Sequence, residues 1–204
     1  MSGVEHFRTG RLTARDWSTD DAAAAYAIYG REDVMRWLGP QPRRPVGSLA
    51  EMTERIEVMA ERAAARPEFG LWPLEVTGTG EVVGAVLLQP LPDGYAAGGQ
   101  PPDAGAEVVE IGWHLNPDHW GHGYATEAGW GAVTLAFGAR DLDRVVAVVE
   151  PANGPSLAVC RRLGMTHLGQ TSQYYGLTLE LFELVRGQDQ GGADATMSGR
   201  QKGR

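Results

Sequence analysis

The chain has little cysteine, no long hydrophobic run and no concentration of positive charge. Only one of its 204 residues is a cysteine, Cys160, so no disulfide can form within the chain. No uninterrupted apolar run reaches the length of about 18 residues that a transmembrane helix needs. The opening stretch, "MSGVEHFRTGRLTARDW", lacks the apolar segment of a secretory signal. These absences predict a cytoplasmic protein with no membrane-spanning segment.

The charge balance excludes further classes of partner. The chain carries 18 Lys and Arg against 26 Asp and Glu, a net charge of -8, with no basic stripe, so no nucleic-acid partner is predicted. An acidic surface attracts cationic amines weakly, or it only keeps the protein in solution, and the sequence leaves both open. The five histidines and the single cysteine show no metal-ligand spacing, which predicts no metal site.

Hydrophobic periodicity and turn residues predict an α+β fold in a single domain. The hydrophobic fraction of 43% supports one core for a chain of this length. Strands are predicted at residues 11–17, 69–76, 81–89, 107–115, 144–150, 166–174 and 177–186. A Gly/Pro/Ala-rich surface loop is predicted at 90–106, and a flexible polar tail at 187–204 after a domain of residues 1–186.

Four helices are predicted between these strands. The first begins at Ser18 or Thr19, and the second begins at the capping box "SLAE" and ends at about Arg66, before Pro67. The third covers 125–139, and the fourth has Pro155 at its first position and ends at Gly164. Helices therefore interrupt a mostly antiparallel sheet, without a regular βαβ repeat.

A pair of glycines stands where the strand at 107–115 gives way to a helix. In "HWGHGYATEA", Gly121 and Gly123 allow a sharp turn, and the first N–H groups of the following helix can bind an anion. The alternative is an ordinary tight turn. The P-loop lysine is missing, and Thr126 stands where a dinucleotide-binding fingerprint has its third glycine.

The stretch "EIGWHLNPDHWGHGYATEA", followed by "NGPSLAVCRRLGM", resembles the GNAT acetyltransferase superfamily, in particular its RimJ/RimL-like branch. The family motif [Q/R]-x-x-G-x-[G/A] falls on Trp120 to Ala125. The opening "RTGRLTARDW" resembles the family's first strand, so the resemblance spans about Arg8 to Arg186. Two residues depart from the family pattern: Trp120 replaces Gln or Arg, and His122 replaces Lys or Arg.

The resemblance implies a mixed, mostly antiparallel central sheet flanked by helices. In it, the strands at 107–115 and 144–150 splay apart to form an acetyl-CoA cleft. It further implies direct transfer of the acetyl group from acetyl-CoA to a primary amine, on a protein N-terminus or a small molecule. The residues implied to bind the cosubstrate are Trp113, His114, Leu115, Gly121, His122, Gly123, Tyr124, Ala125 and Asn153.

Candidate catalytic residues follow from the same resemblance. Glu110 is the first candidate general base, unless it is a solvated carboxylate like Glu107, and His119 is the reserve candidate. Ser156 is the candidate donor to the leaving thiolate, unless it only caps a helix. A tyrosine at 174 or 175 could also reach that position.

Several positions leave alternatives open. Asn153 also fits a helix N-cap, Cys160 fits a packed helix core, and Trp37 with the proline loop after it could line the acceptor pocket. An exposed hairpin edge could support a homodimer. A GNAT-like module that binds CoA without turnover is the alternative function.

Overall fold

The computed structural model describes residues 3–91 and 107–187. Most of the predicted surface loop, residues 92–106, and the predicted tail from 188 onward lie outside the described residues. In the described part of the chain, no helix combines the length and the hydrophobicity needed to cross a membrane.

The described residues form one eight-stranded sheet with the order β1-β2-β3-β4-β5-β6-β8-β7. All neighbouring strands are antiparallel except β5 and β6, which are parallel. The strands are β1 (Glu5–Arg8), β2 (Leu12–Arg15), β3 (Gly70–Val76), β4 (Val82–Pro90), β5 (Val109–Leu115), β6 (Arg144–Val149), β7 (Thr166–Thr171) and β8 (Leu179–Val185).

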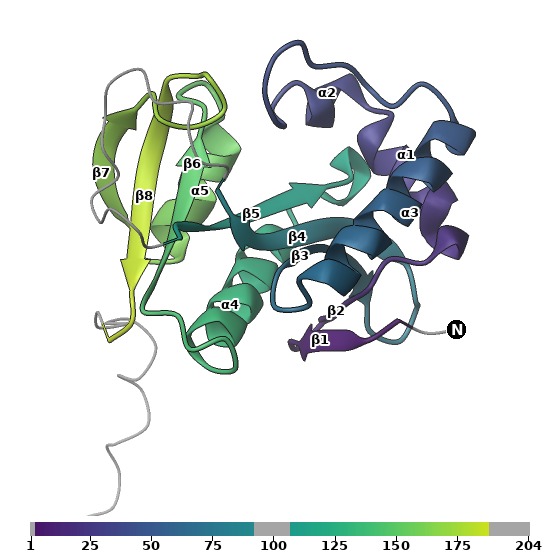
Figure 1. Ribbon diagram of the computed structural model, residues 1–204, viewed down its shortest axis with the longest axis horizontal. Helices are drawn as coiled ribbons and strands as arrows, with labels where there is room; N and C mark the ends of the chain where they lie inside the picture. The colour runs from purple at the N-terminus through teal and green to yellow at the C-terminus, as the bar shows by residue number, and fades with distance from the viewer. Residues whose placement is uncertain (1–2, 92–106, 188–204) are drawn as a thin grey trace, which may run out of the picture.

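Helices cover both faces of this sheet (Figure 1). The helices are α1 (Ala22–Tyr29), α2 (Glu32–Met35), α3 (Leu49–Ala65), α4 (Tyr124–Phe137) and α5 (Gly154–Arg162). Helices α1 and α3 pack on one face, and α4 and α5 pack on the other. As predicted, Ser48 caps α3 by accepting the N–H of Glu51, and α3 ends just before Pro67.

Two hydrophobic clusters hold these layers together. Between the sheet and α4 and α5 lie fully buried side chains such as Trp72, Leu88 and Ile111. Between the sheet and α1 and α3 lie others such as Ile28 and Met52. Burying one such side chain stabilises the fold by about 1.5–3 kcal/mol, so both clusters contribute heavily to folding.

The sheet has a seam between β5 and β6. Strand β4 pairs with β5 along its whole length, and β8 pairs with all of β6. By contrast, β5 and β6 pair only at Glu110 and Val146. In Figure 1, β3 to β5 run across the view while β6 and β8 run nearly vertically. Beyond Glu110 the two strands therefore diverge, as the splayed pair in the predicted fold requires.

The structure adds two short elements to the prediction. Strand β1 and helix α2 have four residues each, too few for hydrophobic periodicity to identify. The last two strands are shorter than predicted. Strand β7 ends at Thr171 and β8 begins at Leu179, because the chain turns between them through Tyr175 and Gly176, both at positive φ.

Candidate active site

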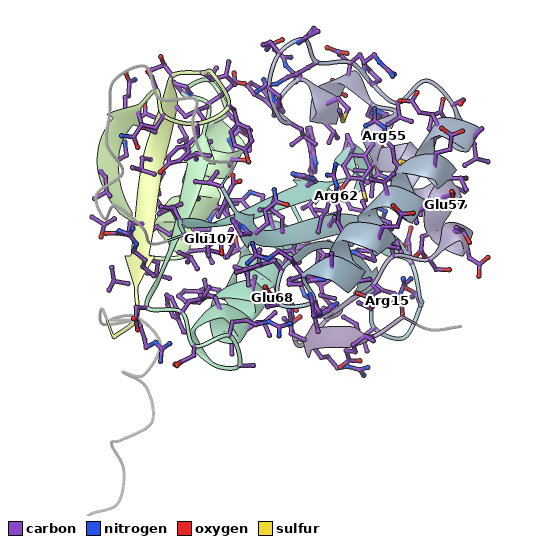
Figure 2. All side chains as sticks on the ribbon, in the orientation of Figure 1. Arg15, Arg55, Glu57, Arg62, Glu68 and Glu107 are labelled. Atoms are coloured by element: carbon purple, nitrogen blue, oxygen red, sulfur yellow. The ribbon has the colours of Figure 1, made fainter. Side chains whose placement is uncertain are left out.

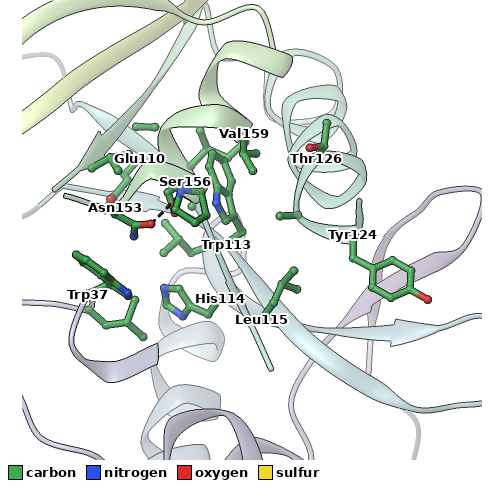
Figure 3. Close-up of a pocket in the computed structure, with 18 of the residues that line it drawn as sticks. Trp37, Glu110, Trp113, His114, Leu115, Tyr124, Thr126, Asn153, Ser156 and Val159 are labelled. Atoms are coloured by element: carbon green, nitrogen blue, oxygen red, sulfur yellow. Dashed lines mark hydrogen bonds between the residues drawn. The ribbon is translucent and has the colours of Figure 1, made fainter. Parts of the chain in front are cut away.

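A cleft of about 1630 Å³ opens where β5 and β6 diverge. Side chains and backbone from β5, β6, the start of α4, the start of α5 and the loop after α2 line it. In Figure 3, Glu110, Asn153 and Ser156 lie toward one end of this cleft, and Tyr124 lies at the other end. The sequence-predicted catalytic residues and most of the predicted cosubstrate residues thus meet around one cavity.

The free edge of β5 faces this cleft. In an antiparallel ladder, successive residues direct their backbone N–H and C=O groups to opposite edges. Asn116 donates its N–H to Val83 on the β4 side, at 3.0 Å, so the backbone of His114 also faces β4. Trp113 and Leu115 therefore direct their backbone groups toward the side from which β6 has diverged. Of the three predicted residues on this strand, two present backbone groups to the cleft.

Trp120 lies at one end of the free edge of β5. Its indole N–H donates to the carbonyl oxygen of Leu115 at 3.0 Å, and its side chain is 47% exposed. Trp120 also lines the cleft. The residue that replaces the family's Gln or Arg therefore contacts the strand edge through a hydrogen bond.

The glycine loop, Gly121 to Gly123, leads directly into α4. Both glycines have φ of 80°, a left-handed conformation that glycine adopts without a steric penalty. The first hydrogen bond of α4 runs from the N–H of Glu127 to the carbonyl of Gly123, at 3.1 Å. The N–H groups of Tyr124, Ala125 and Thr126 come before that bond and have no partner within the helix. Gly123, as the N-cap, supplies no side chain to them, so this helix start suits an anion.

The side chain of His122 contacts the chain shortly before this loop and the first residue of α4. Its ring Nδ1 lies 3.2 Å from the carbonyl oxygen of His119, and its ring stacks on Tyr124. His122 is not among the residues that line the cleft. Its part in cosubstrate binding stays a prediction.

Glu110 is buried at the point where the strands separate. It is 6% exposed, and burial raises its pKa to about 7, while a hydrogen bond from the Tyr175 hydroxyl, at 2.6 Å, acts to lower it. Glu107 behaves differently: Arg66 pairs with it at 2.7 Å on the surface and also with Glu68 at 3.0 Å. Figure 2 labels the two carboxylates, Glu107 and Glu68. The alternative of a solvated carboxylate at Glu110 is therefore wrong.

Tyr175 is the tyrosine that reaches the cleft. Its φ of 57° is unusual for a residue with a side chain and typically costs about 1 kcal/mol or more. Neighbouring Tyr174 is buried in a separate cluster with Leu91, Val146 and Leu179. The sequence named both tyrosines without choosing between them.

The start of α5 brings Asn153 and Ser156 to the cleft wall. The side-chain oxygen of Asn153 accepts the N–H of Ser156 at 3.2 Å, so Asn153 is a helix N-cap, the alternative that the sequence had left open. Both residues line the cleft. Cys160 is fully buried in the core, and burial raises its pKa to about 12, as expected for a packed thiol with no nucleophilic role.

The opposite wall of the cleft is built by α2 and the loop after it. The Tyr29 hydroxyl lies 3.2 Å from Nδ1 of His114, and burial lowers the pKa of His114 to about 4, so its ring is neutral at pH 7. Trp37 lines this wall, and its contact with the acceptor stays a prediction. His119, the reserve base, instead pairs with Glu81 at 3.2 Å and is not part of the cleft lining.

Arg43 and Glu150 join the two walls. Arg43 has a side chain that is only 7% exposed; it donates to Glu150 and to the carbonyl oxygens of Arg36 and Gly39. These residues are missing from the sequence prediction, because no local motif marks a contact between positions so far apart in the chain.

A free strand edge, an uncapped helix start and a buried carboxylate with a pKa about 7 surround one cleft. Together they fit one class of enzyme, an acyltransferase that uses a CoA thioester. The model of the acetyltransferase (GNAT) domain family matches residues 11–166, more than half of the chain. The chain belongs to the GNAT acetyltransferase family, and the family prediction is confirmed.

Individual relatives agree with this assignment. An uncharacterized N-acetyltransferase of Bacillus subtilis, YoaA, is 26% identical over 167 residues, which cover 81% of this chain and 85% of YoaA. RimJ of Mycobacterium smegmatis in complex with CoA-disulfide shares the fold, with a TM-score of 0.67 and 20% identity. That match covers 91% of this chain and 87% of the RimJ chain.

A third relative is AAC(6')-Ib, solved in complex with ribostamycin and coenzyme A. It matches with a TM-score of 0.64 and 19% identity over 86% of this chain and 93% of its own. The predicted fold class is thereby confirmed, and the chain is an enzyme that performs acetyl-CoA-dependent acetylation. In residues 3–91 and 107–187, no group of three or more His, Cys, Asp or Glu side chains is placed to hold a metal ion.

Proposed function

We propose that this enzyme transfers the acetyl group of acetyl-CoA to a primary amine, on a protein N-terminus or a small molecule, with Glu110 as general base. The observation that carries this proposal is the buried carboxylate of Glu110, with a pKa of about 7, at the point where β5 and β6 part. A group with this pKa is close to half ionised at neutral pH and can accept a proton.

The free edge of β5 and the start of α4 fit the two parts of acetyl-CoA. The backbone groups of Trp113 and the N–H of Leu115, whose carbonyl accepts from Trp120, would receive the amide-bearing pantetheine arm as an added strand. Asn153 would contact the same arm. The pyrophosphate would be bound by backbone N–H groups of the glycine loop and of Tyr124 and Ala125. For His114 we propose a different part from cosubstrate binding: its side chain would line the side of the cleft that receives the acceptor amine.

The chemistry divides among few residues. Acetyl-CoA supplies the activated acetyl group. An aliphatic amine with a pKa of roughly 10 is mostly protonated at pH 7, so Glu110 takes its proton, directly or through water. Ser156, at the start of α5, donates a hydrogen bond to the leaving thiolate. The cleft walls orient the amine, which is the larger part of catalysis in a direct transfer.

The relatives represent both acceptor classes of the proposal. A ribosomal-protein-S5-alanine acetyltransferase from Vibrio fischeri has a similar fold, and AAC(6')-Ib was solved in complex with ribostamycin. The test is an assay of CoA thiol release with a panel of N-terminal peptides, polyamines and aminoglycosides. Turnover on one class and not on the others would assign the acceptor.

The same assay tests Glu110. Glu110→Gln should lower kcat by about 10²–10⁴, the usual contribution of a general base. Glu107→Gln is the matched control, because it removes a surface carboxylate just before the same strand. Binding of acetyl-CoA without turnover of any amine would instead support a CoA-binding module.

Calorimetry with acetyl-CoA tests the location of the cosubstrate. Gly123→Trp should abolish binding, because it forces a large side chain into a left-handed position on the glycine loop. Gly78→Trp introduces the same strain in the β3–β4 turn, where a side chain meets open space. Unchanged binding in Gly123→Trp would disprove the placement.

Two earlier predictions remain proposals. Strand β7 is one edge of the sheet, and light scattering after gel filtration would show whether it supports a homodimer. A cytoplasmic location is tested by cell fractionation.

A further inference from the structure

The turn between β1 and β2 forms hydrogen bonds with the first turn of α4, which lies more than a hundred residues further along the chain. Glu127 of α4 accepts the backbone N–H of Arg11 at 2.7 Å and its side-chain Nε at 2.6 Å. The hydroxyl of Thr9 donates to the same carboxylate at 2.6 Å. Three donors from one tight turn thus converge on one carboxylate at the helix start.

Arg11 also contacts the glycine loop itself. Its Nη1 donates to the carbonyl oxygen of His122 at 3.0 Å, and its guanidinium lies 4.8 Å from the centre of the Tyr124 ring. In a trans peptide, the carbonyl of one residue and the N–H of the next point in opposite directions. By holding the His122 carbonyl on its own side, Arg11 turns the N–H of Gly123 to the other side of the loop.

The charge of Glu127 makes this contact more consequential. A carboxylate in the first turn of a helix repels an anion that binds at that helix start. Although burial acts to raise the pKa of Glu127, hydrogen bonds from Thr9 and Arg11 hold it below its usual range, so the group is ionised. Arg11 is the cation paired with it, and its side chain is half exposed. The neighbouring position in the loop, His122, replaces the Lys or Arg of the family pattern.

We propose that Arg11 is a positioning residue for the phosphate-binding loop. It fixes the direction of the Gly123 N–H through the His122 carbonyl, and it neutralises Glu127 beside the bound pyrophosphate. This inference rests on the proposed acetyl-CoA site and concerns how that site is held in shape. Arg11 acts through the loop and through Glu127, and it takes no part in the acetyl transfer.

The test compares ligands with and without the pyrophosphate. Calorimetry gives the Kd of acetyl-CoA, and competition gives the affinity of S-acetyl-pantetheine, which lacks the nucleotide and both phosphates of the pyrophosphate. Arg11→Gln should weaken acetyl-CoA binding about three- to tenfold, the usual effect of one charge at a helix start, and leave S-acetyl-pantetheine unchanged. In steady-state assays the KM for acetyl-CoA should rise while kcat at saturation stays the same.

Further variants separate the two contributions of Arg11. Arg11→Gln combined with Glu127→Gln should recover part of the lost affinity, because the unpaired carboxylate is gone. Arg11→Lys keeps the charge and should lose less than Arg11→Gln. Arg66→Gln is the control, since Arg66 is similarly exposed and also pairs with a carboxylate, but at the surface before β5.

The outcomes distinguish this inference from the proposed function. If the unmodified protein binds no acetyl-CoA, the proposed function fails and this inference fails with it. If the unmodified protein binds acetyl-CoA and Arg11→Gln binds it equally well, only the role of Arg11 is overturned. Equal losses for acetyl-CoA and S-acetyl-pantetheine would also overturn it, because they would reveal a general loss of folding.

Discussion

The hydrogen bond from Tyr175 to Glu110 controls how readily the carboxylate takes up a proton. Burial raises the pKa of Glu110, and the Tyr175 hydroxyl acts in the opposite direction. Tyr175→Phe removes that hydroxyl, so the pKa of Glu110 should rise above about 7. If Glu110 is the base, the rise of kcat/KM with pH should move to higher pH in Tyr175→Phe.

The measurement is a pH profile of kcat/KM for both proteins. Tyr26→Phe, an exposed position on α1, is the control for loss of a tyrosine hydroxyl. A profile that stays in place, or that moves to lower pH, would contradict the proposed contact between Tyr175 and the base.

Glu110 and His114 make opposite contributions to stability. The folded-state pKa of Glu110 is raised from 4.5 to about 7, so stability is present below pH 4.5 and is lost as pH rises through 7. The folded-state pKa of His114 is lowered from 6.5 to about 4, so stability is present above pH 6.5 and is lost as pH falls through 4. Between about pH 4.5 and pH 6.5, a rise in pH therefore removes the stability that depends on Glu110 and restores the stability that depends on His114.

A single substitution should reveal how the stability of the protein depends on the ionisation of Glu110. At about 1.4 kcal/mol per pKa unit, the burial of Glu110 costs about 3 kcal/mol above pH 7. Relative to the unmodified protein, Glu110→Gln should therefore gain stability between pH 5 and pH 8, as measured by urea unfolding. Glu107→Gln should show no such gain, because ion pairing with Arg66 holds the pKa of Glu107 below its usual range. A constant difference between Glu110→Gln and the unmodified protein would refute this assignment.

At the scale of elements, Arg43 fastens the loop after α2 to the end of β6. Glu150→Gln leaves the buried guanidinium of Arg43 without its carboxylate, which should destabilise the protein by about 1–3 kcal/mol. Because this loop lines the wall that we propose to contact the acceptor, the KM of the amine should rise more than the KM of acetyl-CoA. Steady-state kinetics with each substrate varied in turn, together with thermal unfolding, measure both effects.

The control for this loop is Glu51→Gln. Glu51 pairs with Arg44, the residue next to Arg43, but it lies in the first turn of α3 and does not line the cleft. This variant should leave the KM of the amine unchanged. If Glu51→Gln raises the KM of the amine as Glu150→Gln does, the rise comes from the loss of a negative charge near this loop and not from the contact between Arg43 and Glu150 across the cleft.

The elements that the sequence predicted correctly are those whose signals are local. Ser48 caps α3 three residues before Glu51, and the turn at Thr77 to Gly80 joins two strands that pair with each other. By contrast, β1 is stabilised by its place in the sheet and against α4, contacts that no short window of sequence contains. Helix α2 is a single turn, too short to form from propensity alone.

In the candidate site, too, the sequence marks the residues with local signals and misses the contacts between distant positions. The glycine loop and Glu110 were found because a motif and a strand position mark them. The partners that give them their properties come from distant positions: Tyr175 is 65 residues from Glu110, and Arg11 is 111 residues from His122. Only the folded chain brings these side chains together, so the sequence could name Tyr175 only as an alternative to Tyr174 and gave no sign of Arg11.

At the scale of the whole molecule, the seam makes the cleft a junction between two parts of the sheet. A ligand that contacts both β5 and α5 connects these parts, and any ligand that binds only the folded state stabilises it. At a concentration 100 times its Kd, acetyl-CoA should add about 2.7 kcal/mol. For a domain of this size, that raises the melting temperature by about 5–10 °C.

Thermal unfolding with and without acetyl-CoA measures this shift. Gly123→Trp should show little or no shift, while Gly78→Trp should show the full one. An equal rise in both variants would place the ligand away from the glycine loop.

Trp120 gives the cleft an optical signal of its own. Its indole is half exposed, and its N–H is fixed to the carbonyl of Leu115 beside the free edge of β5. A ligand that displaces water from this edge surrounds the ring with a less polar medium, which shifts tryptophan fluorescence to shorter wavelength. The difference between the unmodified protein and Trp120→Phe isolates this residue from the five other tryptophans. Occupancy of the cleft can therefore be followed in real time without a label.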